Sequence, residues 1–306
     1  MSMTSARTHK VAVVGCGNVG RFASQAVLAS DDFGLAGIVR RPESVCACIP
    51  PELAHVPVVS SIKDLDDVEV AILAVPTREV PEYAREILSL GINTVDSYDI
   101  HGELVRVKLE LDDVARQSGS VAVISAGWDP GTDSLIRVIL EIMAPKGITY
   151  TNFGPGVSMG HTTVVRAVPG VKDAMSITYP KGSGTHRRLV YVELEEGADF
   201  DAIRQAIITD PYFRHDETIV TCVENVEDYR DFGHGVAIER KGVSGVSCNQ
   251  RFRFEMSINN PALTGQVMVG AARAGLKQSP GAYTLPEIPL IDFLFGDRNS
   301  LLTRLV

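Results

Sequence analysis

The chain has 306 residues, of which 45% are hydrophobic and 22% are charged, and its formal net charge at pH 7 is -9. This length and composition predict a globular protein with two domains of moderate size. The negative charge argues against binding to nucleic acid or to an anionic membrane, because phosphate groups require clustered Lys and Arg. No apolar run reaches the roughly 18 residues that span a bilayer, and no signal-peptide pattern precedes the first strand-like run. We therefore expect a cytoplasmic protein whose partner is a small molecule.

The cysteines and histidines do not form a metal-binding pattern. The five cysteines are scattered, and neither Cys-x-x-Cys nor His-Glu-x-x-His occurs. We expect buried or incidental thiols and no metal site.

The first part of the chain alternates short apolar runs with amphipathic stretches. The runs are VAVVG, LAGIV, PVV, VAILAV, NTVDS and VAVIS, and the stretches between them include PEYAREILSL. Continuous apolar strands separated by helices are typical of a parallel sheet that is covered on both faces. The pattern predicts a Rossmann-type, doubly wound α/β domain over residues 1–125.

The pattern changes after residue 125. A helix is expected over residues 133–143, followed by strands with alternating polar positions, such as RRLVYVELE and NQRFRFEMSI. Alternation predicts a mostly antiparallel sheet, and hence an α+β domain over residues 126–260. We expect the helix that begins at Pro261 and the tail up to residue 306 to pack back on the first domain. A half-covered antiparallel sheet also favours a homodimer.

The first predicted strand ends in a glycine-rich loop. Its G-x-G-x-x-G pattern lies between a strand and a helix and consists of Gly15, Cys16, Gly17, Asn18, Val19 and Gly20. The glycines permit a tight turn and a close approach to a pyrophosphate, which the N–H groups of the helix then face. This context favours dinucleotide binding over a purely structural turn.

Two arginines end the second predicted strand. An acid at this position favours NAD, whereas arginine suits the 2'-phosphate of NADP. Arg40 and Arg41 occupy it and no acid is available, so NADP is favoured; the alternative is a solvated strand end. Val75, Pro76 and Thr77 end the fourth strand, where the nicotinamide ribose is expected.

Acidic and aromatic residues follow the fifth and sixth strands. Asp96 and Asp99 end one strand, and Trp128 and Asp129 follow the other. Because ligands bind outside the carboxyl ends of parallel strands, we expect these side chains to face a cationic, ammonium-bearing substrate. Helix capping is the alternative for each acid, and it is the preferred role of Asp133.

Several segments together closely resemble the meso-diaminopimelate dehydrogenases, a family of NADP-dependent amino-acid dehydrogenases. They are GCGNVGR, the arginine pair, TVDSYDIHG, VISAGWDPGTDS, FGPGVSMGH, FGHGV and INNPALT. The similarity runs from about Lys10 to the C-terminus, and the short PKGSGTHRR connection resembles a compact subgroup.

The resemblance implies reversible oxidative deamination of the D-centre of meso-2,6-diaminopimelate. Hydride passes to NADP, and the products are L-2-amino-6-oxopimelate, which cyclises to tetrahydrodipicolinate, and ammonia. In reverse, the reaction makes a precursor of lysine and of the cell wall.

The resemblance also implies roles for individual residues. Asp99 contacts the reacting amino group, with Asp129 close by and Trp128 as a wall. Asp96 is expected to bind the substrate because it ends the same strand, and not because of the resemblance. The remaining substrate residues, at the distal L-centre or as lining, are Thr178, Arg188, His234, Asn260, Phe153, Met159 and Gly160.

Some alternatives stay open. The general acid or base is one of Asp96, Asp99, Asp129 and His161. Either Arg187 or Arg188 is merely solvated, and the resemblance favours Arg188 as the ligand. The alternative functions are a relaxed-specificity D-amino-acid dehydrogenase and a non-catalytic NADP-sensing protein.

Overall fold

The computed structural model describes residues 8–45, 49–229 and 234–306, and the chain forms two compact units. The first unit comprises residues 1–136 and 261–306, and the second comprises residues 137–260. Within the described residues, no helix is both long enough and apolar enough to cross a membrane.

The first unit is built on a seven-stranded sheet, counted over the described residues, in the order β14-β6-β5-β4-β1-β2-β3. All its neighbouring strands run parallel. The strands are β1 (His9–Val14), β2 (Phe33–Val39), β3 (Val58–Val59), β4 (Val70–Leu73), β5 (Asn93–Asp96), β6 (Val121–Ile124) and β14 (Gly281–Thr284). The order changes direction between β1 and β4, which is where such sheets bind their ligands.

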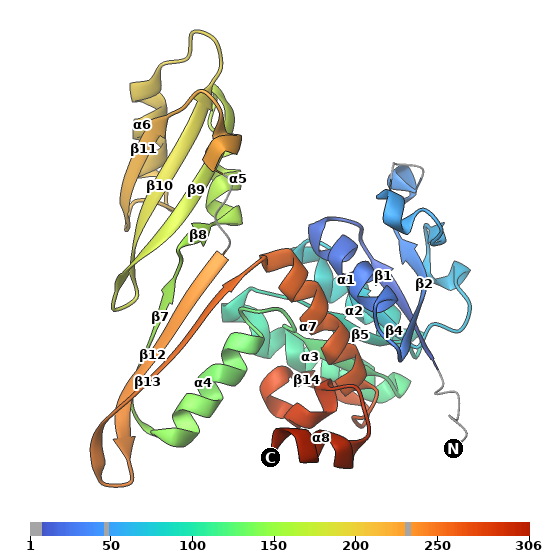
Figure 1. Cartoon of the computed structure of the whole chain (residues 1–306). Helices are drawn as coiled ribbons and strands as arrows, with labels where there is room; N and C mark the ends of the chain where they lie inside the picture. The colour runs from blue at the N-terminus through green and yellow to red at the C-terminus, as the bar shows by residue number, and fades with distance from the viewer. Residues whose placement is uncertain (1–7, 46–48, 230–233) are drawn as a thin grey trace. The chain divides into compact units, whose positions relative to one another are not determined.

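Helices cover both faces of this sheet (Figure 1). Alternate residues of β1 point to opposite faces: Val11 packs in one core with residues of α1 and α7, and Ala12 packs in the other with residues of α2 and α3. The helices that contribute to these two cores are α1 (Asn18–Leu28), α2 (Val80–Ser89), α3 (Leu104–Ser118) and α7 (Asn260–Gly275), and α8 (Arg298–Leu305) ends the chain. These two buried faces are why the strands read as continuous apolar runs.

The C-terminal segment is part of this first unit. Its strand β14 pairs with β6, and its helix α7 contributes Met268 and Val269 to one core. Arg273 of α7 binds Asp32, just before β2, with Nε–Oδ2 and Nη2–Oδ1 distances of 2.5 and 2.8 Å. Both side chains are only 12% exposed, so this two-pronged contact fixes α7 against the start of β2.

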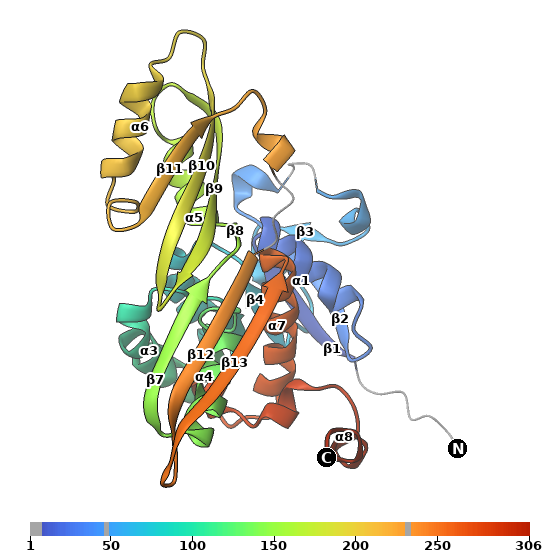
Figure 2. The ribbon, with the colours of Figure 1, turned by 60° about the vertical axis from the view of Figure 1, so that its left-hand side comes forward.

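The second unit contains two sheets, in the orders β11-β10-β9-β8 and β13-β12-β7 (Figure 2). Their strands are β7 (Lys146–Phe153), β8 (Gly156–Val157), β9 (Val171–Gly182), β10 (Thr185–Leu194), β11 (Glu217–Cys222), β12 (His234–Ser244) and β13 (Ser247–Ile258). Neighbours are antiparallel except β10 and β11, which are parallel.

Two helices cover one face of the four-stranded sheet. Val165 of α5 (Met159–Arg166) and Ile203 of α6 (Phe200–Thr209) share a core with Val190 and Val192 of β10. A further helix, α4 (Thr132–Met143), leads from the first unit into the second.

The predicted fold class is confirmed, since a parallel Rossmann-type sheet is combined with mostly antiparallel sheets. The expectation of a single second sheet was wrong, because the strands separate into two. The sequence reasoning also missed elements that are short or mixed in polarity, namely β7, β8, β14, α5 and α6.

Candidate functional site

The glycine-rich loop connects β1 to α1, and its three glycines are needed for different reasons. Gly15 has φ +97°, and a Cβ there would lie 2.4 Å from the carbonyl oxygen of Ala74. A Cβ at Gly20 would lie 2.2 Å from the carbonyl oxygen of Gly15, so the helix can approach the loop only without a side chain. A Cβ at Gly17 would meet nothing within 4 Å, which leaves the start of α1 open to a ligand.

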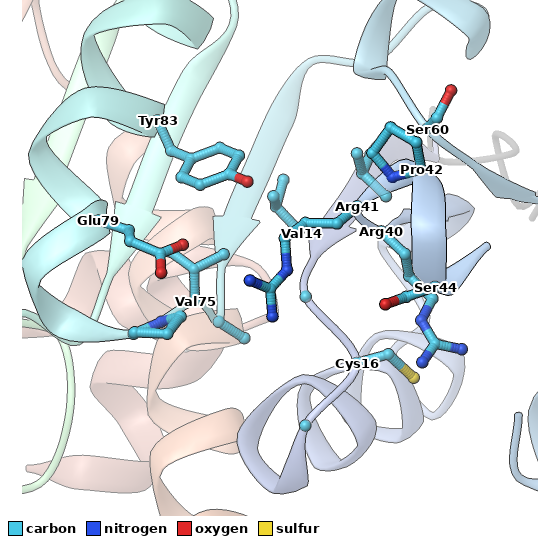
Figure 3. Close-up of a pocket in the computed structure, with 15 residues that line it drawn as sticks. Val14, Cys16, Arg40, Arg41, Pro42, Ser44, Ser60, Val75, Glu79 and Tyr83 are labelled. Atoms are coloured by element: carbon cyan, nitrogen blue, oxygen red, sulfur yellow. The ribbon is translucent and has the colours of Figure 1, made fainter. Parts of the chain in front are cut away.

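A cavity of about 340 Å³ lies at this loop, where the carboxyl ends of β1, β2 and β4 meet (Figure 3). Six of the predicted cofactor residues line it, namely Gly15, Gly17, Arg40, Arg41, Val75 and Pro76. The other four do not: Asn18, Val19 and Gly20 form the first turn of α1, and Thr77 begins a 3-10 helix after Pro76. Sequence reasoning missed the lining residues Pro42, Ser44, Ser60, Glu79 and Tyr83. Pro42 and Ser44 follow β2 and Ser60 follows β3, whereas Glu79 and Tyr83 lie in the 3-10 helix and in α2 that follow β4.

The arginine pair gives the cavity its charge. Arg40 and Arg41 follow β2 and lie on the side of the cavity opposite Glu79 and Tyr83 (Figure 3). The ion pair of Arg41 with Glu43 is long, at 3.6 Å, and both side chains are more than 60% exposed, so it holds the guanidinium weakly. A dinucleotide with a 2'-phosphate fits this set of donors: N–H groups of α1 for the pyrophosphate and guanidinium groups for the extra phosphate.

The loops after β4, β5 and β6 carry the predicted catalytic residues. Asp99 is exposed, and its backbone N–H donates to Thr77 Oγ1 at 3.2 Å, which ties the end of β5 to the end of β4. Trp128 is only 8% exposed, and its carbonyl accepts the N–H of Asp133 at 2.9 Å. Asp129 next to it is half-buried. The first unit thus places Asp99, Trp128 and Asp129 at the carboxyl edge of the sheet, as predicted from the sequence.

Asp96 differs from this expectation. Its side chain is fully buried, and Oδ1 accepts the backbone N–H groups of Tyr98 at 2.9 Å and Ser125 at 3.0 Å. Burial raises the pKa of Asp96 to about 6, and the two N–H donors oppose that shift. A carboxyl with no exposed surface cannot contact a substrate here, so this placement does not support the predicted contact.

Asp133 is also fully buried, in the first turn of α4. A buried acid in a first turn suits the dipole of the helix.

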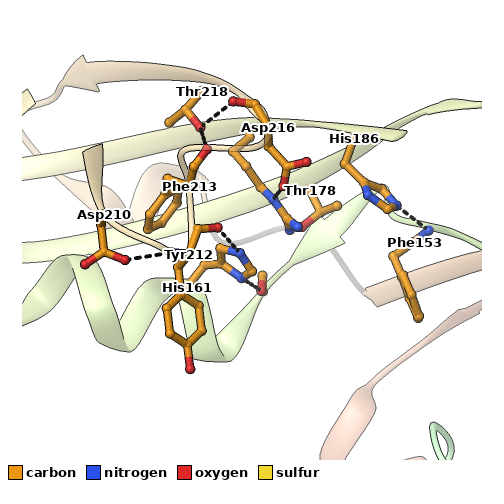
Figure 4. A network of polar contacts seen from close by, with 11 residues as sticks. Phe153, His161, Thr178, His186, Asp210, Tyr212, Phe213, Asp216 and Thr218 are labelled. Carbon is orange, nitrogen blue, oxygen red and sulfur yellow. Dashed lines mark hydrogen bonds and ion pairs between the residues drawn. The ribbon is translucent and has the colours of Figure 1, made fainter. Parts of the chain in front are cut away.

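The second unit has its own polar cluster, in which Thr178, Asp216 and His161 lie near one another (Figure 4). Arg188 on β10 lies opposite Thr178 on β9, and its Nη1 donates to Thr178 Oγ1. Its Nε donates to Asp216 Oδ2 at 2.7 Å, and the Arg188 side chain is only 12% exposed. These bonds fix the plane of the guanidinium, which is the group that binds carboxylates in bidentate fashion.

His161 on α5 belongs to the same cluster. Its Nε2 lies 3.1 Å from the carbonyl oxygen of Tyr212, and its Nδ1 lies 2.7 Å from Ser158 Oγ. Because a carbonyl can only accept, Nε2 carries the proton and Nδ1 accepts from the serine. Burial first and the nearby Arg188 second lower the pKa of His161 to about 4, so the ring is neutral at pH 7.

Two further imidazoles of this unit, those of His186 and His234, bond to backbone groups. His186 Nε2 accepts the backbone N–H of Phe153 at 3.1 Å, and the two rings are in contact. Burial and Arg188 lower the pKa of His186. His234 begins β12, and its Nδ1 donates to the carbonyl of Val157 at 2.9 Å. His186 was not predicted as a site residue. It lies two residues before Arg188 on β10, so the two side chains share one face of the strand, and this spacing could have indicated it.

The remaining predicted substrate residues lie at the starts of helices α5 and α7. Gly160 is exposed in the first turn of α5, and Asn260 is half-buried at the start of α7. Met159 begins α5, and its side chain lies outside the described part of the structure. Within the described residues, no group of three or more His, Cys, Asp or Glu side chains could hold a metal ion.

Comparison with known proteins gives consistent matches over the whole chain. A family model described as the diaminopimelic acid dehydrogenase C-terminal domain matches residues 127–184, and one for an oxidoreductase family with an NAD-binding Rossmann fold matches residues 9–95. The meso-diaminopimelate D-dehydrogenase of Bacteroides fragilis is 54% identical over 97% of this chain and 99% of its own length. That of Corynebacterium glutamicum is 30% identical over 91% and 93%, respectively.

Solved structures agree with these matches. The C. glutamicum DAP dehydrogenase in complex with DAP has a TM-score of 0.82 at 29% identity, covering 99% of this chain and 100% of that one. An engineered D-amino acid dehydrogenase bound to NADP+ has a TM-score of 0.78 at 28% identity, covering 98% and 100%.

Proposed function

The chain belongs to the meso-diaminopimelate D-dehydrogenase family, and we propose that it catalyses the reversible, NADP-dependent oxidative deamination of the D-centre of meso-2,6-diaminopimelate. The reaction consumes water, which supplies the oxo oxygen, and oxidised NADP, and it yields L-2-amino-6-oxopimelate, ammonia, reduced NADP and a proton. The observation that carries the proposal is the 54% identity over 97% of the chain to an enzyme of that name. The geometry of each unit supports it independently.

NADP is the cofactor, and the first unit holds it. The N–H groups at the start of α1 and the open space at Gly17 suit the pyrophosphate, and Arg40 and Arg41 suit the 2'-phosphate. Val75 and Pro76 line the same cavity, and we propose that the nicotinamide ribose binds beside them. When bound, the nicotinamide accepts the hydride that leaves the D-configured α-carbon.

Two carboxylates of the first unit are available for the substrate ammonium and its proton. Asp99 is exposed at the end of β5, and Asp129 is half-buried beside Trp128. The other two candidates for the acid or base are disfavoured. Asp96 is buried and bonded to the backbone, and both ring nitrogens of His161 are engaged. We therefore assign proton transfer to Asp99 and Asp129, and orientation of the reacting carbon to Trp128.

The second unit supplies groups for the unreacting L-centre. Arg188 is held by Asp216 and Thr178 and is suited to the distal carboxylate. We propose His234 and Asn260 as further hydrogen-bonding groups, with Phe153, Met159 and Gly160 as lining. A doubly zwitterionic substrate needs such a second polar set, whereas a protein that only senses NADP does not.

An activity panel tests the function. Purified protein with NADP is given meso-, LL- and DD-diaminopimelate and simple D-amino acids, and formation of reduced nicotinamide and ammonia is followed. Turnover of the meso isomer alone is expected. Equal turnover of simple D-amino acids would transfer the assignment to a relaxed D-amino-acid dehydrogenase, and NADP binding without any turnover would favour a sensing protein.

We also propose a homodimer that forms through the second unit. The C-terminal half of α4 exposes an apolar stripe of Val138, Ile139, Ile142 and Met143, with Ile142 75% exposed. Such a stripe on a helix that already packs Leu140 into the interior suits a second copy of the chain. Sedimentation should show a dimer that Ile142→Glu dissociates, whereas Val246→Glu, at the 95% exposed β12–β13 turn, should leave it intact.

We also propose a cytoplasmic location, which cell fractionation can test.

A further inference from the structure

The loops after β5 and β6 are joined by a compact hydrogen-bond network centred on Asp96. Asp96 Oδ1 accepts the N–H of Tyr98 at 2.9 Å and that of Ser125 at 3.0 Å. Ser125 Oγ donates to the Tyr98 carbonyl at 2.7 Å, and the Ala126 N–H donates to the Asp96 carbonyl at 2.6 Å. Three of these four bonds connect the segment that leads to Asp99 with the segment that leads to Trp128, and the fourth, from the Tyr98 N–H, fixes the Asp96 carboxylate within the first segment.

The network also holds a backbone conformation that a serine rarely adopts. Ser125 has φ +57°, in the left-handed region, where a non-glycine residue costs free energy. This turn sends the chain from β6 toward Trp128. Gly127 follows so closely against the first loop that a Cβ there would meet Ser97 Cβ at 3.5 Å. The two loops therefore lie side by side, and Asp96 makes two of the bonds that keep them there.

A buried acid is a costly way to make these bonds, which suggests that the position needs it. Asp96 has no exposed surface, and Oδ2 makes no hydrogen bond to any described residue. Burying such a group is unfavourable unless its bonds repay the desolvation. Tyr98 and Ser125 are only 2% and 3% exposed, so their N–H groups need an acceptor inside the protein, and the Asp96 carboxylate provides it.

We propose that Asp96 is a positioning residue: its carboxylate sets the spacing between the loop that carries Asp99 and the loop that carries Trp128 and Asp129. The proposal rests on the function proposed above, because it assigns these loops to the reacting amino group and α-carbon. Asp96 itself touches neither substrate nor cofactor. Its effect on rate comes from the geometry that it imposes on the residues that do.

The test compares Asp96→Ala, which removes the acceptor, with Asp96→Asn, which keeps an acceptor oxygen of the same size. The matched control is Thr94→Val on the same strand, since Thr94 is equally buried and its hydroxyl has no hydrogen bond among the described residues. Trp128 is the only tryptophan in the chain, so its emission reports directly on the second loop. Each variant is assayed for kcat and KM, for NADP affinity, and for tryptophan emission and its quenching by acrylamide.

Asp96→Ala should lower kcat by about tenfold to a hundredfold, the size of effect expected when reacting groups are misplaced by about 1 Å. NADP affinity should change less than about twofold, because the cofactor cavity has no contact with Asp96. The Trp128 emission should shift and become easier to quench. Asp96→Asn should recover most of the rate, and Thr94→Val should behave like the wild type.

Several results would overturn the proposal. A folded Asp96→Ala variant with wild-type kcat and wild-type emission would show that the network does not position the loops. An Asp96→Asn variant as slow as Asp96→Ala would show that the ionisable group, and not the acceptor, is needed. If Asp96→Ala does not fold, Ser125→Ala replaces it in the test, because this variant removes the bond from Ser125 Oγ to the Tyr98 carbonyl. Ser125→Ala should lower kcat and shift the tryptophan emission. A Ser125→Ala variant with unchanged kcat and unchanged emission would overturn the proposal.

The two proposals fail in distinguishable ways. A wild-type protein without activity on meso-diaminopimelate would refute the function, whereas the emission of the Asp96 variants would still report whether the loop moves.

Discussion

Replacing Arg188 by methionine should impair recognition of the distal carboxylate while leaving NADP binding unchanged. The guanidinium is 12% exposed and is aligned by Asp216 at 2.7 Å and by Thr178, so little reorganisation precedes binding. A hydrogen bond to a charged group contributes about 1.5–3 kcal/mol, which corresponds to about a 10- to 150-fold loss in kcat/KM. Because the contact exists before and during the reaction, most of the loss should appear as a higher KM.

The neighbouring Arg187 provides the matched control. Its ion pair with Glu217 is 3.0 Å long, but the two side chains are 44% and 41% exposed, so the pair contributes about 0–1 kcal/mol to stability. Arg187→Met should therefore leave KM for meso-diaminopimelate and for NADP unchanged. Steady-state kinetics with both substrates, together with a circular dichroism spectrum of each variant, decide the question. An Arg188→Met enzyme with unchanged KM, or an equal rise in Arg187→Met, would refute the assignment of Arg188.

Three further predictions concern the first unit and one concerns the second. Exchanging Arg40 and Arg41 for serine should weaken NADP by at least about 10- to 150-fold and spare NAD, because even one lost charge-assisted bond is worth about 1.5–3 kcal/mol. Titration with both coenzymes checks this, and an equal loss for both would count against it. Gly20→Ala places a Cβ 2.2 Å from the carbonyl oxygen of Gly15. The substitution should lower the free energy of unfolding by about 1–3 kcal/mol, measured by denaturant unfolding, and should weaken NADP binding. Unchanged stability and unchanged NADP affinity would contradict the clash. Asp96 has a pKa of about 6 in the folded protein and 3.8 in the unfolded chain, so the native state binds the Asp96 proton more tightly. The free energy of unfolding should therefore fall by about 3 kcal/mol as the pH rises from about 4 to 6. The free energy of unfolding of Asp96→Asn should rise by that amount relative to the wild type between pH 4 and 7. A difference between the two proteins that does not change with pH would exclude a raised pKa of Asp96. His161 should titrate by NMR near pH 4, because burial disfavours its charged form; a transition near 6.5 would show that the ring is not held as described.

The first unit could be predicted well because its signals are local. Strands buried on both faces read as continuous apolar runs, and a glycine loop between a strand and a helix has few other uses. The strand β14 shows the limit of such reasoning. Its sequence, GAYT, has no apolar periodicity, and it is a strand because its backbone pairs with β6, far away along the chain.

The candidate site shows the same division. Asp96 and Asp99 lie three residues apart after one apolar run, and both could be predicted to face a ligand. Strand direction and packing distinguish the two acids. The Asp96 carboxyl is fully buried and accepts backbone N–H groups, whereas Asp99 is exposed at the edge of the sheet. His161 is similar, since only the folded chain places a carbonyl and a hydroxyl against its two nitrogens.

The sequence by itself determined the doubly wound sheet, the preference for NADP and the residue types available at the strand ends, because each of these depends on periodicity and short-range spacing. The tertiary structure decided which acid is buried, which histidine stays neutral and which arginine is fixed by hydrogen bonds. These properties depend on desolvation and on hydrogen-bond partners that come from distant parts of the chain.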